Sequence, residues 1–196
     1  ELGIEGRKAI VCASSLGLGR ACAMSLARAG VEITINARNA DRLAQTADEI
    51  AQEVPGAIIN TVAADITTSD GQAAIFENCP APDILVTNAG GPPFKHFREL
   101  DRQAMVDGLK MNMITPIELV QRAIGGMVDR KFGRIVNITS VSVKMPISGL
   151  DLSSGARAGL TAFLAGVARD VAPSNVAINN LLPGYFDTDR FRSGLA

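Results

Sequence analysis

Short apolar runs alternate with amphipathic stretches along this chain of 196 residues, and few folds accommodate that pattern. The runs show no clean alternation of apolar and polar positions, which is typical of strands buried on both faces of a parallel sheet. The pattern therefore predicts six strands in a sheet covered by helices. Their residue ranges are 9–13, 33–35, 58–64, 84–87, 135–138 and 176–182.

Helical periodicity occupies the segments between these runs. A long helical pattern extends over residues 106–127 and contains Pro116. Because proline has no backbone N–H and its ring crowds the preceding turn, we expect Pro116 to kink or split this helix. A second helix is predicted where apolar residues recur at helical spacing in a polar segment. These residues are Leu43, Ala47, Ile50 and Val54.

Repeated strand–helix–strand units build parallel sheets through right-handed crossovers. The sequence thus predicts an α/β fold, a Rossmann-type doubly wound parallel sheet with five or six helices on both faces. Single domains run to roughly 100–200 residues, so one hydrophobic core suits this length. No repeat, low-complexity tract or linker divides the chain, and we predict that residues 1–196 form one domain.

Composition argues against several classes of protein. Lys and Arg total 19 against 20 for Asp and Glu, whereas nucleic-acid binders usually carry a clear basic excess. No apolar run approaches the roughly 20 residues of a membrane-spanning helix. The odd number of cysteines, without a secretory signal, favours a cytoplasmic protein. One histidine and no metal-ligand motif indicate that the chain binds no metal.

A glycine-containing turn follows the first predicted strand and leads into a helix at residues 20–29. Glycines at such a turn let backbone N–H groups approach a pyrophosphate at the helix N-terminus. Any tight turn can also use glycine, but the position between strand and helix favours coenzyme binding. The residues predicted to bind the coenzyme here are Ser14, Ser15, Leu16, Gly17, Leu18 and Gly19.

The end of the second predicted strand indicates which coenzyme binds. Units that bind NAD place Asp or Glu there to hold the ribose 2′-hydroxyl. This chain has Ala37 followed by Arg38, and arginine can hold the 2′-phosphate of NADP by charge-assisted hydrogen bonds. Arg38 could instead be an ordinary surface arginine. The missing acid favours NADP.

These features and several further motifs resemble the short-chain dehydrogenase/reductase family over residues 8–188. The segment Thr87-Asn88-Ala89-Gly90 resembles the family's Asn-Asn-Ala-Gly motif, and the strand ending in Ser140 resembles the one that carries the catalytic serine. The resemblance implies a coenzyme site, with Asp65 and Ile66 near the adenine and Asn112 positioning a catalytic water. The other coenzyme-binding residues that it implies are Asn88, Ala89, Gly90, Pro183, Gly184 and Thr188.

The chain departs from the family pattern at three positions. Ala13 stands where the family has the first glycine of the loop. Ser153 and Arg157 stand where the family has its catalytic tyrosine and lysine, so we take both as candidate catalytic residues. A serine hydroxyl is a much poorer acid than a phenol, and loss of a positioned acid–base group forfeits about 10²–10⁴-fold in rate. Arginine stays charged and cannot relay protons.

Another side chain could supply the proton. Lys144 lies four residues past Ser140, Tyr185 directly follows Pro183-Gly184, and His96 follows a Gly-Pro-Pro turn. Each of the three is also explained as an exposed loop residue.

Two functional hypotheses remain. The first is an NADP-dependent oxidoreductase that interconverts a small-molecule carbonyl and an alcohol. The overall pattern most resembles the beta-ketoacyl-carrier-protein reductase branch of the family, which implies a 3-oxoacyl or similar substrate. The second is a catalytically weak NADP-binding protein, a sensor or partner subunit, which Ser153 and Arg157 favour. A purely structural domain explains neither the glycine loop nor residues 88–90.

The segment 153–172 is rich in small residues and predicts a helix with two faces. Leu160, Phe163, Leu164 and Val167 are expected to cover the sheet, and the small residues to admit a second helix. The resemblance implies a homodimer or homotetramer built on this helix and the preceding long one. It also implies a substrate-covering helix and a last strand after the Pro-Gly motif, so we expect the C-terminal part of the fold to be missing.

Overall fold

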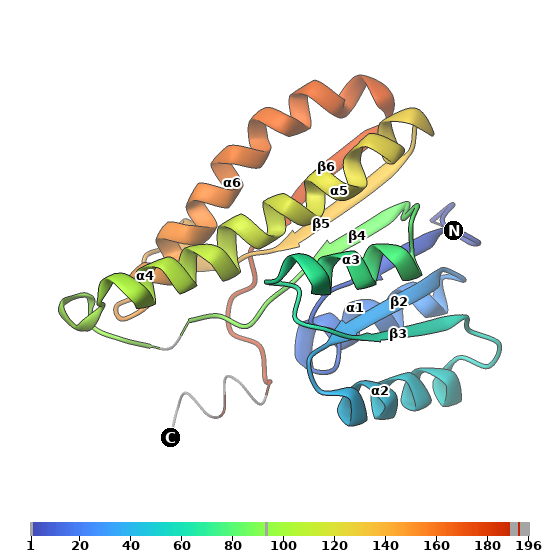
Figure 1. The fold of residues 1–196 in the computed structure, drawn as a ribbon, viewed down its shortest axis with the longest axis horizontal. Helices are drawn as coiled ribbons and strands as arrows, with labels where there is room; N and C mark the ends of the chain where they lie inside the picture. Colours follow the sequence, from blue (N-terminus) through green and yellow to red (C-terminus); the bar gives the residue numbers. More distant parts are fainter. Residues whose placement is uncertain (1, 93, 189–191, 193–196) are drawn as a thin grey trace.

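The computed structural model describes residues 2–92, 94–188 and 192. Its described residues form one sheet of six parallel strands in the order β3-β2-β1-β4-β5-β6 (Figure 1). The direction of strand addition reverses between β1 and β4. The Rossmann-type fold is confirmed, and all six predicted strands are present. They are β1 (Lys8–Val11), β2 (Glu32–Ala37), β3 (Ile59–Ala63), β4 (Ile84–Thr87), β5 (Gly133–Ile138) and β6 (Val176–Leu181).

Helices cover the sheet on both faces, as predicted. Helices α1 and α2 pack on one face, and α3, α5 and α6 pack on the other (Figure 1). The α-helices are α1 (Gly17–Arg28), α2 (Ala40–Glu53), α3 (Ser69–Asn78), α4 (Arg102–Leu109), α5 (Thr115–Asp129) and α6 (Asp151–Val171). Short 3₁₀ turns are η1 (Phe97–Glu99), η3 (Val141–Val143) and η4 (Ala172–Ser174).

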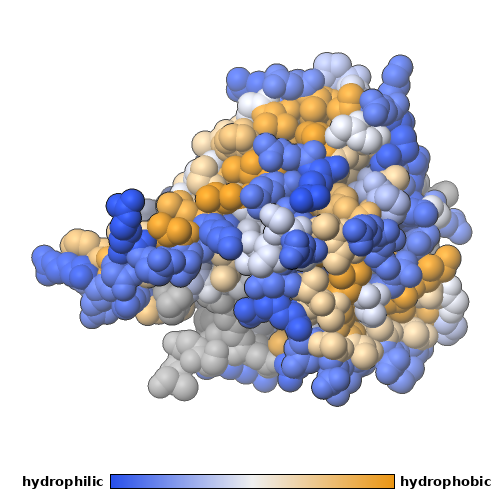
Figure 2. Space-filling view, viewed as in Figure 1, coloured by the Kyte–Doolittle hydropathy of each residue, from blue (hydrophilic) through white to orange (hydrophobic). Residues whose placement is uncertain are grey.

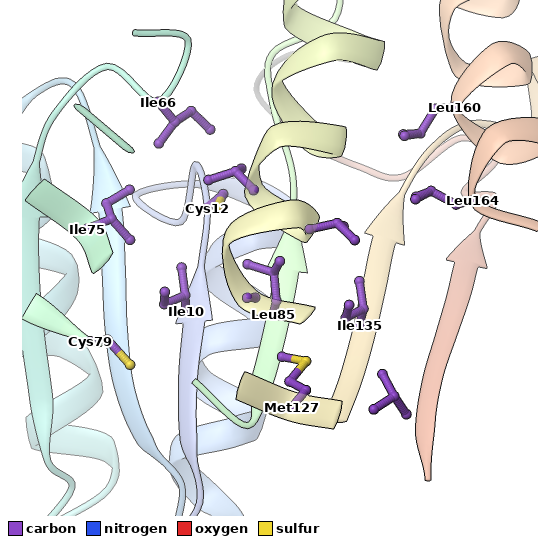
Figure 3. Packing of buried hydrophobic residues seen from close by; sticks show 14 residues of the cluster. Ile10, Cys12, Ile66, Ile75, Cys79, Leu85, Met127, Ile135, Leu160 and Leu164 are labelled. Carbon is purple, nitrogen blue, oxygen red and sulfur yellow. The ribbon is translucent and has the colours of Figure 1, made fainter. Parts of the chain in front are cut away.

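The two faces of the sheet bury two hydrophobic clusters. Figure 3 shows the cluster beneath α3, α5 and α6, where Ile10 and Leu85 of the central strands meet Met127, Leu160 and Leu164. All five side chains are essentially inaccessible to water. Burial of one such side chain stabilises a fold by about 1.5–3 kcal/mol, so this cluster fixes the strands that carry the site.

The long helical segment is split in the way that Pro116 predicts. Helix α4 ends at Leu109, a π-helical turn follows (η2, Lys110–Ile114), and α5 begins at Thr115. Since Pro116 cannot donate a hydrogen bond to the carbonyl four residues earlier, the regular ladder is interrupted at residue 112. Single π-helical turns inside helices are frequent at functional sites, and this one contains Asn112.

Helix α6 differs from the prediction at one residue. Leu160, Leu164 and Val167 lie toward the sheet as expected, whereas Phe163 is 47% exposed. The expectation that Phe163 covers the sheet was wrong, because it lies at the margin of the apolar face, about 60° around the helix from Leu160 and about 100° from Leu164. Neither α6 nor any other helix in the described ranges is long and apolar enough to cross a membrane.

Candidate coenzyme and catalytic site

The predicted site residues gather at the carboxyl edge of the sheet. In a parallel sheet every strand points the same way, so the loops after β1, β4, β5 and β6 leave from one edge. Open α/β sheets bind ligands at this edge, where the strand order reverses. Here the reversal lies between β1 and β4, which places the glycine loop beside Asn88.

The N-terminus of α1 lacks a side-chain cap. Its N-cap residue is Leu16, and α6, which follows Leu150, has no side-chain cap either. By contrast, Asn39, Thr68 and Asp101 each accept a backbone N–H bond at the starts of α2, α3 and α4. The first turn of a helix has N–H groups without helical partners, and their dipoles favour an anion. The uncapped end of α1 therefore suits a phosphate group.

The geometry excludes a side chain at Gly19 and favours glycine at Gly17. A Cβ at Gly19 would collide with the carbonyl oxygen of Ala13 and lie 2.9 Å from Asn88 Nδ2. Gly17 has a φ of +52°, and a Cβ there would lie 3.6 Å from a methyl carbon of Thr188. The loop, Asn88 and the segment after β6 are thus in close contact, as the sequence predicts for one coenzyme site.

Ser14 and Ser15 are held by hydrogen bonds to the neighbouring strands and to α2. Ser14 is fully buried: its hydroxyl donates to the carbonyl of Val11 (2.8 Å) and accepts from the backbone N–H of Asn36 (2.9 Å). The Ser15 carbonyl accepts a bond from the hydroxyl of Thr46 on α2 (3.1 Å). The Ser14 backbone N–H donates to the carbonyl of Asn36 (2.8 Å), so both its hydroxyl and its N–H are occupied within the fold and only its carbonyl is left to face the coenzyme.

Arg38, Asp65 and Ile66 lie at the ends of β2 and β3. Arg38 is exposed, and its charge acts on Asp65. The backbone N–H of Thr67 donates to Asp65 Oδ1 (2.9 Å) and holds the pKa of that carboxyl below its usual range, against the opposing effect of burial. The Ile66 side chain packs in the core, so its backbone is the part that faces the edge.

Asn112 lies deep in the cleft between β4 and α6. Its Nδ2 donates to the carbonyl of Gly108 (3.3 Å), while its Oδ1 is buried and has no hydrogen-bond partner among the residues that the structure describes. Asn88, Ala89, Asn112 and Arg157 share the lining of a cavity of about 10 Å³. That volume holds about one water molecule, and a buried acceptor without a partner favours a water there.

Ser140 follows β5 and is partly exposed at the edge. Its Oγ accepts a bond from the backbone N–H of Ser142 (3.1 Å), which leaves the hydroxyl hydrogen able to donate elsewhere. Pro183 lies beside it, since its carbonyl accepts from the N–H of Val141 (2.9 Å). Gly184 beyond it is exposed.

Ser153 and Arg157 form a buried pair one helical turn apart on α6. Arg157 Nε donates to Ser153 Oγ (3.2 Å), and Nη1 donates to the carbonyl of Ile138 (2.7 Å). Both residues are less than a tenth exposed. Arg157 thus fixes the end of β5, two residues before Ser140.

The three alternative proton donors are at the surface. Lys144 is exposed, Tyr185 is 72% exposed, and His96 is exposed with its Nδ1 accepting from the N–H of Arg98 (3.3 Å). Among the residues that the structure describes, no group of three or more acidic, histidine or cysteine side chains could hold a metal ion.

Buried asparagines that the sequence analysis left out organise the edge. Asn36 Nδ2 donates to the carbonyls of Val62 and Ala64, which ties β2 to the end of β3. Asn137 accepts from the Thr87 hydroxyl (2.7 Å) and donates to Asn180 (3.2 Å), which links β4, β5 and β6. A polar residue inside an otherwise apolar strand was the available signal for both.

Ala13 has a φ of +46°, in the left-handed region that favours glycine. We expect Ala13→Gly to raise the free energy of unfolding by about 0.5–1 kcal/mol, because relief of strain of roughly 1–2 kcal/mol exceeds the entropy that glycine adds to the unfolded chain. Urea unfolding at constant m-value measures this change.

Ala29→Gly is the matched control, because Ala29 has an ordinary φ of −87°. It should lower the free energy of unfolding by about 0.5–1 kcal/mol. A loss of similar size in both variants would contradict strain at Ala13.

Comparisons with known proteins agree with this geometry. Residues 7–194 match the family described as short chain dehydrogenase. The 3-oxoacyl-[acyl-carrier-protein] reductase FabG of Aquifex aeolicus is 32% identical over 193 residues, which covers 96% of this chain and 77% of that protein. The continuation predicted beyond the Pro-Gly motif stays a prediction.

Solved structures show the same likeness. The crystal structure of YwfH, an NADPH dependent reductase involved in bacilysin biosynthesis, has a TM-score of 0.92 at 28% identity and covers 96% of this chain and 76% of its own. The L-sorbose reductase of Gluconobacter frateurii, complexed with NADPH and L-sorbose, has a TM-score of 0.91 at 27% identity, with 96% and 73% covered. The chain therefore belongs to the short-chain dehydrogenase family of oxidoreductases.

Proposed function

We propose that this protein is an NADP-dependent oxidoreductase that interconverts a small-molecule carbonyl and an alcohol. One observation carries the proposal: the uncapped N-terminus of α1, the buried oxygen of Asn112 and the hydroxyl of Ser140 belong to one edge of one sheet. Relatives named as NADPH-dependent and 3-oxoacyl reductases support it. Residues 1–196 would then form a single NADP-binding domain.

The chain's own groups fit a nicotinamide dinucleotide. The first turn of α1 would bind the pyrophosphate, Asp65 and the Ile66 backbone would border the adenine, and residues 88–90 would flank the nicotinamide ribose. The coenzyme, when bound, supplies or accepts the hydride. Pro183, Gly184 and Thr188 would close over it, since Thr188 lies against Gly17.

Arg38 would select NADP over NAD. It follows β2 directly, at the strand end where the adenine ribose is held, and Ala37 before it has no carboxylate. Its exposed guanidinium is able to approach a 2′-phosphate.

We expect Arg38→Ala to weaken NADPH binding by about 1.5–3 kcal/mol, the scale of a hydrogen bond to a charged group, and to leave NADH binding nearly unchanged. Fluorescence titration of both coenzymes measures the two affinities. Arg169→Ala, at an exposed position in the last turn of α6, is the control. Equal affinity of the wild type for NADPH and NADH would rule out this role.

Ser140 is proposed to bind the reacting oxygen, and Ser153 with Arg157 to occupy the family's tyrosine and lysine positions. Ser140 is partly exposed and has a hydrogen to donate, whereas Ser153 is buried against the Arg157 guanidinium. A serine is shorter than a tyrosine by about one ring width. Water held by Asn112, or Lys144 on the neighbouring loop, would therefore deliver the proton.

The rim of the site favours an apolar substrate, of which a 3-oxoacyl group is one. Phe94, Phe97, Met145, Tyr185 and Phe186 are each more than half exposed and lie on the loops after β4, β5 and β6. The first two loops contact each other, because the N–H of Lys95 donates to the carbonyl of Gly149 (2.9 Å). Large exposed apolar side chains on loops at the ligand-binding edge mark a binding surface, and an acyl chain covers them better than a polyol.

We expect Ser140→Ala to lower turnover on the order of 10²-fold, as for loss of one oxyanion donor, and Ser153→Ala to lower it less than about tenfold. Ser153→Tyr combined with Arg157→Lys should raise turnover, since it restores a positioned acid. NADPH oxidation with ketones and ketoacyl thioesters at saturating coenzyme gives these rates. The assignment of roles fails if Ser153→Ala abolishes turnover and Ser140→Ala does not.

The second candidate function is a catalytically weak NADP-binding protein. The buried Ser153–Arg157 pair favours it, because neither side chain is a proton donor matched to neutral pH. NADPH binding without turnover of any carbonyl in that panel would select this function over the first.

We further propose that α5 and α6 form the interface of a homodimer or homotetramer. The two helices lie side by side, and Figure 2 shows apolar side chains along them. Gly159 packs against Met113 of the same chain, but Cβ atoms at Gly125, Gly155 and Gly166 would meet open space. Together with exposed Phe163, these positions let a second pair of helices approach closely.

Light scattering at micromolar concentration should give the mass of a dimer or tetramer. Phe163→Asp should shift it to the monomer, because the change buries a charge in a two-fold interface. Ile58→Asp, at an exposed position next to β3, should leave the mass unchanged. A monomeric wild type would refute the interface.

A further inference from the structure

We propose that Thr46 is a positioning residue for the peptide that presents the pyrophosphate-binding N–H groups. Thr46 lies in the middle of α2, is 2% exposed, and donates from Oγ1 to the carbonyl oxygen of Ser15 (3.1 Å). The inference rests on the proposed coenzyme site and adds a residue from outside the glycine loop to it. Thr46 itself does not touch the coenzyme.

Thr46 orients the Leu16 N–H through the geometry of one peptide unit. The carbonyl of Ser15 and the N–H of Leu16 belong to the same planar trans peptide and point in opposite directions. A bond that draws the Ser15 carbonyl toward α2 therefore turns the Leu16 N–H away from α2. Leu16 is the uncapped N-cap residue of α1, so this N–H stands at the anion-binding end of that helix.

The Ala13 carbonyl and the Ser14 side chain, which precede Ser15 in the loop, are fixed by other contacts. The Ala13 carbonyl accepts from Asn88 Nδ2 (3.2 Å), and Ser14 bonds to the backbone of Asn36. Thr46 acts on the Ser15 carbonyl, two peptides past the Ala13 carbonyl that Asn88 holds. The three contacts together tie the loop to β4, β2 and α2.

Thr46 has one hydroxyl hydrogen and two carbonyls within reach. Besides Ser15, the carbonyl of Arg42 lies 3.0 Å from Oγ1, which is the common bond of a helical threonine to the residue four earlier. The Arg42 carbonyl already accepts a backbone bond inside α2. The Ser15 carbonyl lies outside any helix, so it is the acceptor that loses most when the hydroxyl is removed.

The bond between Thr46 and the glycine loop predicts which ligands lose affinity when the Thr46 hydroxyl is removed. NADPH and NADH share the pyrophosphate, so both should depend on Thr46. Adenosine 2′-monophosphate carries the 2′-phosphate, which Arg38 is proposed to hold, and has no pyrophosphate. Its affinity should therefore be independent of Thr46.

The test measures dissociation constants of these three ligands for wild type, Thr46→Val and Thr46→Ser by calorimetric titration. Thr46→Val should raise the constants of NADPH and NADH by about three- to tenfold, the effect of one net hydrogen bond, and change that of adenosine 2′-monophosphate by less than about twofold. Thr46→Ser keeps the hydroxyl and should bind all three like the wild type.

Thr161→Val is the matched control. Thr161 on α6 makes the same bond to the residue four earlier, from Oγ1 to the Arg157 carbonyl (2.8 Å), and has no bond to the glycine loop. It should leave the three constants within about twofold of wild type. If Thr46→Val does not fold, Thr46→Ala compared with Thr46→Ser gives the same contrast.

Three results overturn the inference. Dinucleotide binding by Thr46→Val equal to wild type would show that the hydroxyl does not position the loop. Equal weakening of adenosine 2′-monophosphate would show a general loss of structure instead. Failure of the wild type to bind NADPH or NADH would overturn the proposed coenzyme site, and the inference with it.

Discussion

Buried and half-buried side chains that donate to backbone carbonyls hold the carboxyl edge of the sheet in place. Asn88 donates to Ala13, Thr46 to Ser15, Gln72 to Ile66, and Arg157 to Ile138. Loops carry carbonyl groups that a strand or helix would otherwise satisfy, and a buried unpaired carbonyl is costly. The donors to Ala13, Ser15 and Ile138 come from other elements, 75, 31 and 19 residues away along the chain. Three of the four peptides also bond within the fold through their N–H groups, which belong to Ser14, Thr67 and Thr139. In the fourth, the Leu16 N–H points away from the carbonyl that Thr46 holds, because the two groups of a peptide point in opposite directions.

The fold itself was predictable because it depends on local patterns. Each strand was found from a short apolar run, since a strand covered on both faces has no polar side to alternate with. The break at Pro116 was predictable from the missing N–H alone. Phe163 was misplaced because periodicity gives the width of an apolar face only approximately, and a residue at its margin lies toward the sheet or toward solvent depending on the neighbouring helix.

The motifs of the candidate site were predictable from the sequence, whereas the residues that hold its loops in place were not. Glycines, Asn88 and Ser140 stand in short patterns that a sequence displays directly. Thr46 and Asn36 act through contacts with residues 31 and 22 positions away, and no local pattern encodes such a partner. Their one local signal is a polar residue where the helix or strand has an apolar face. The left-handed φ of Ala13 was equally hidden, because alanine reveals no backbone requirement in the way that glycine does.

At Arg157, the side chain that holds the fold together cannot take part in proton transfer. A lysine at this place would have one flexible ammonium, whereas the guanidinium has five donors in a rigid plane. Arg157 uses that plane to join Ser153 on its own helix to Ile138 at the end of β5. These two hydrogen bonds of the Arg157 guanidinium stiffen the strand that presents Ser140. Because the guanidinium stays charged, Arg157 cannot transfer protons. In the proposed function, the glycine loop and the residues that hold it would bind the coenzyme, whereas the proton would come from water in the cavity beside Asn112 or from Lys144.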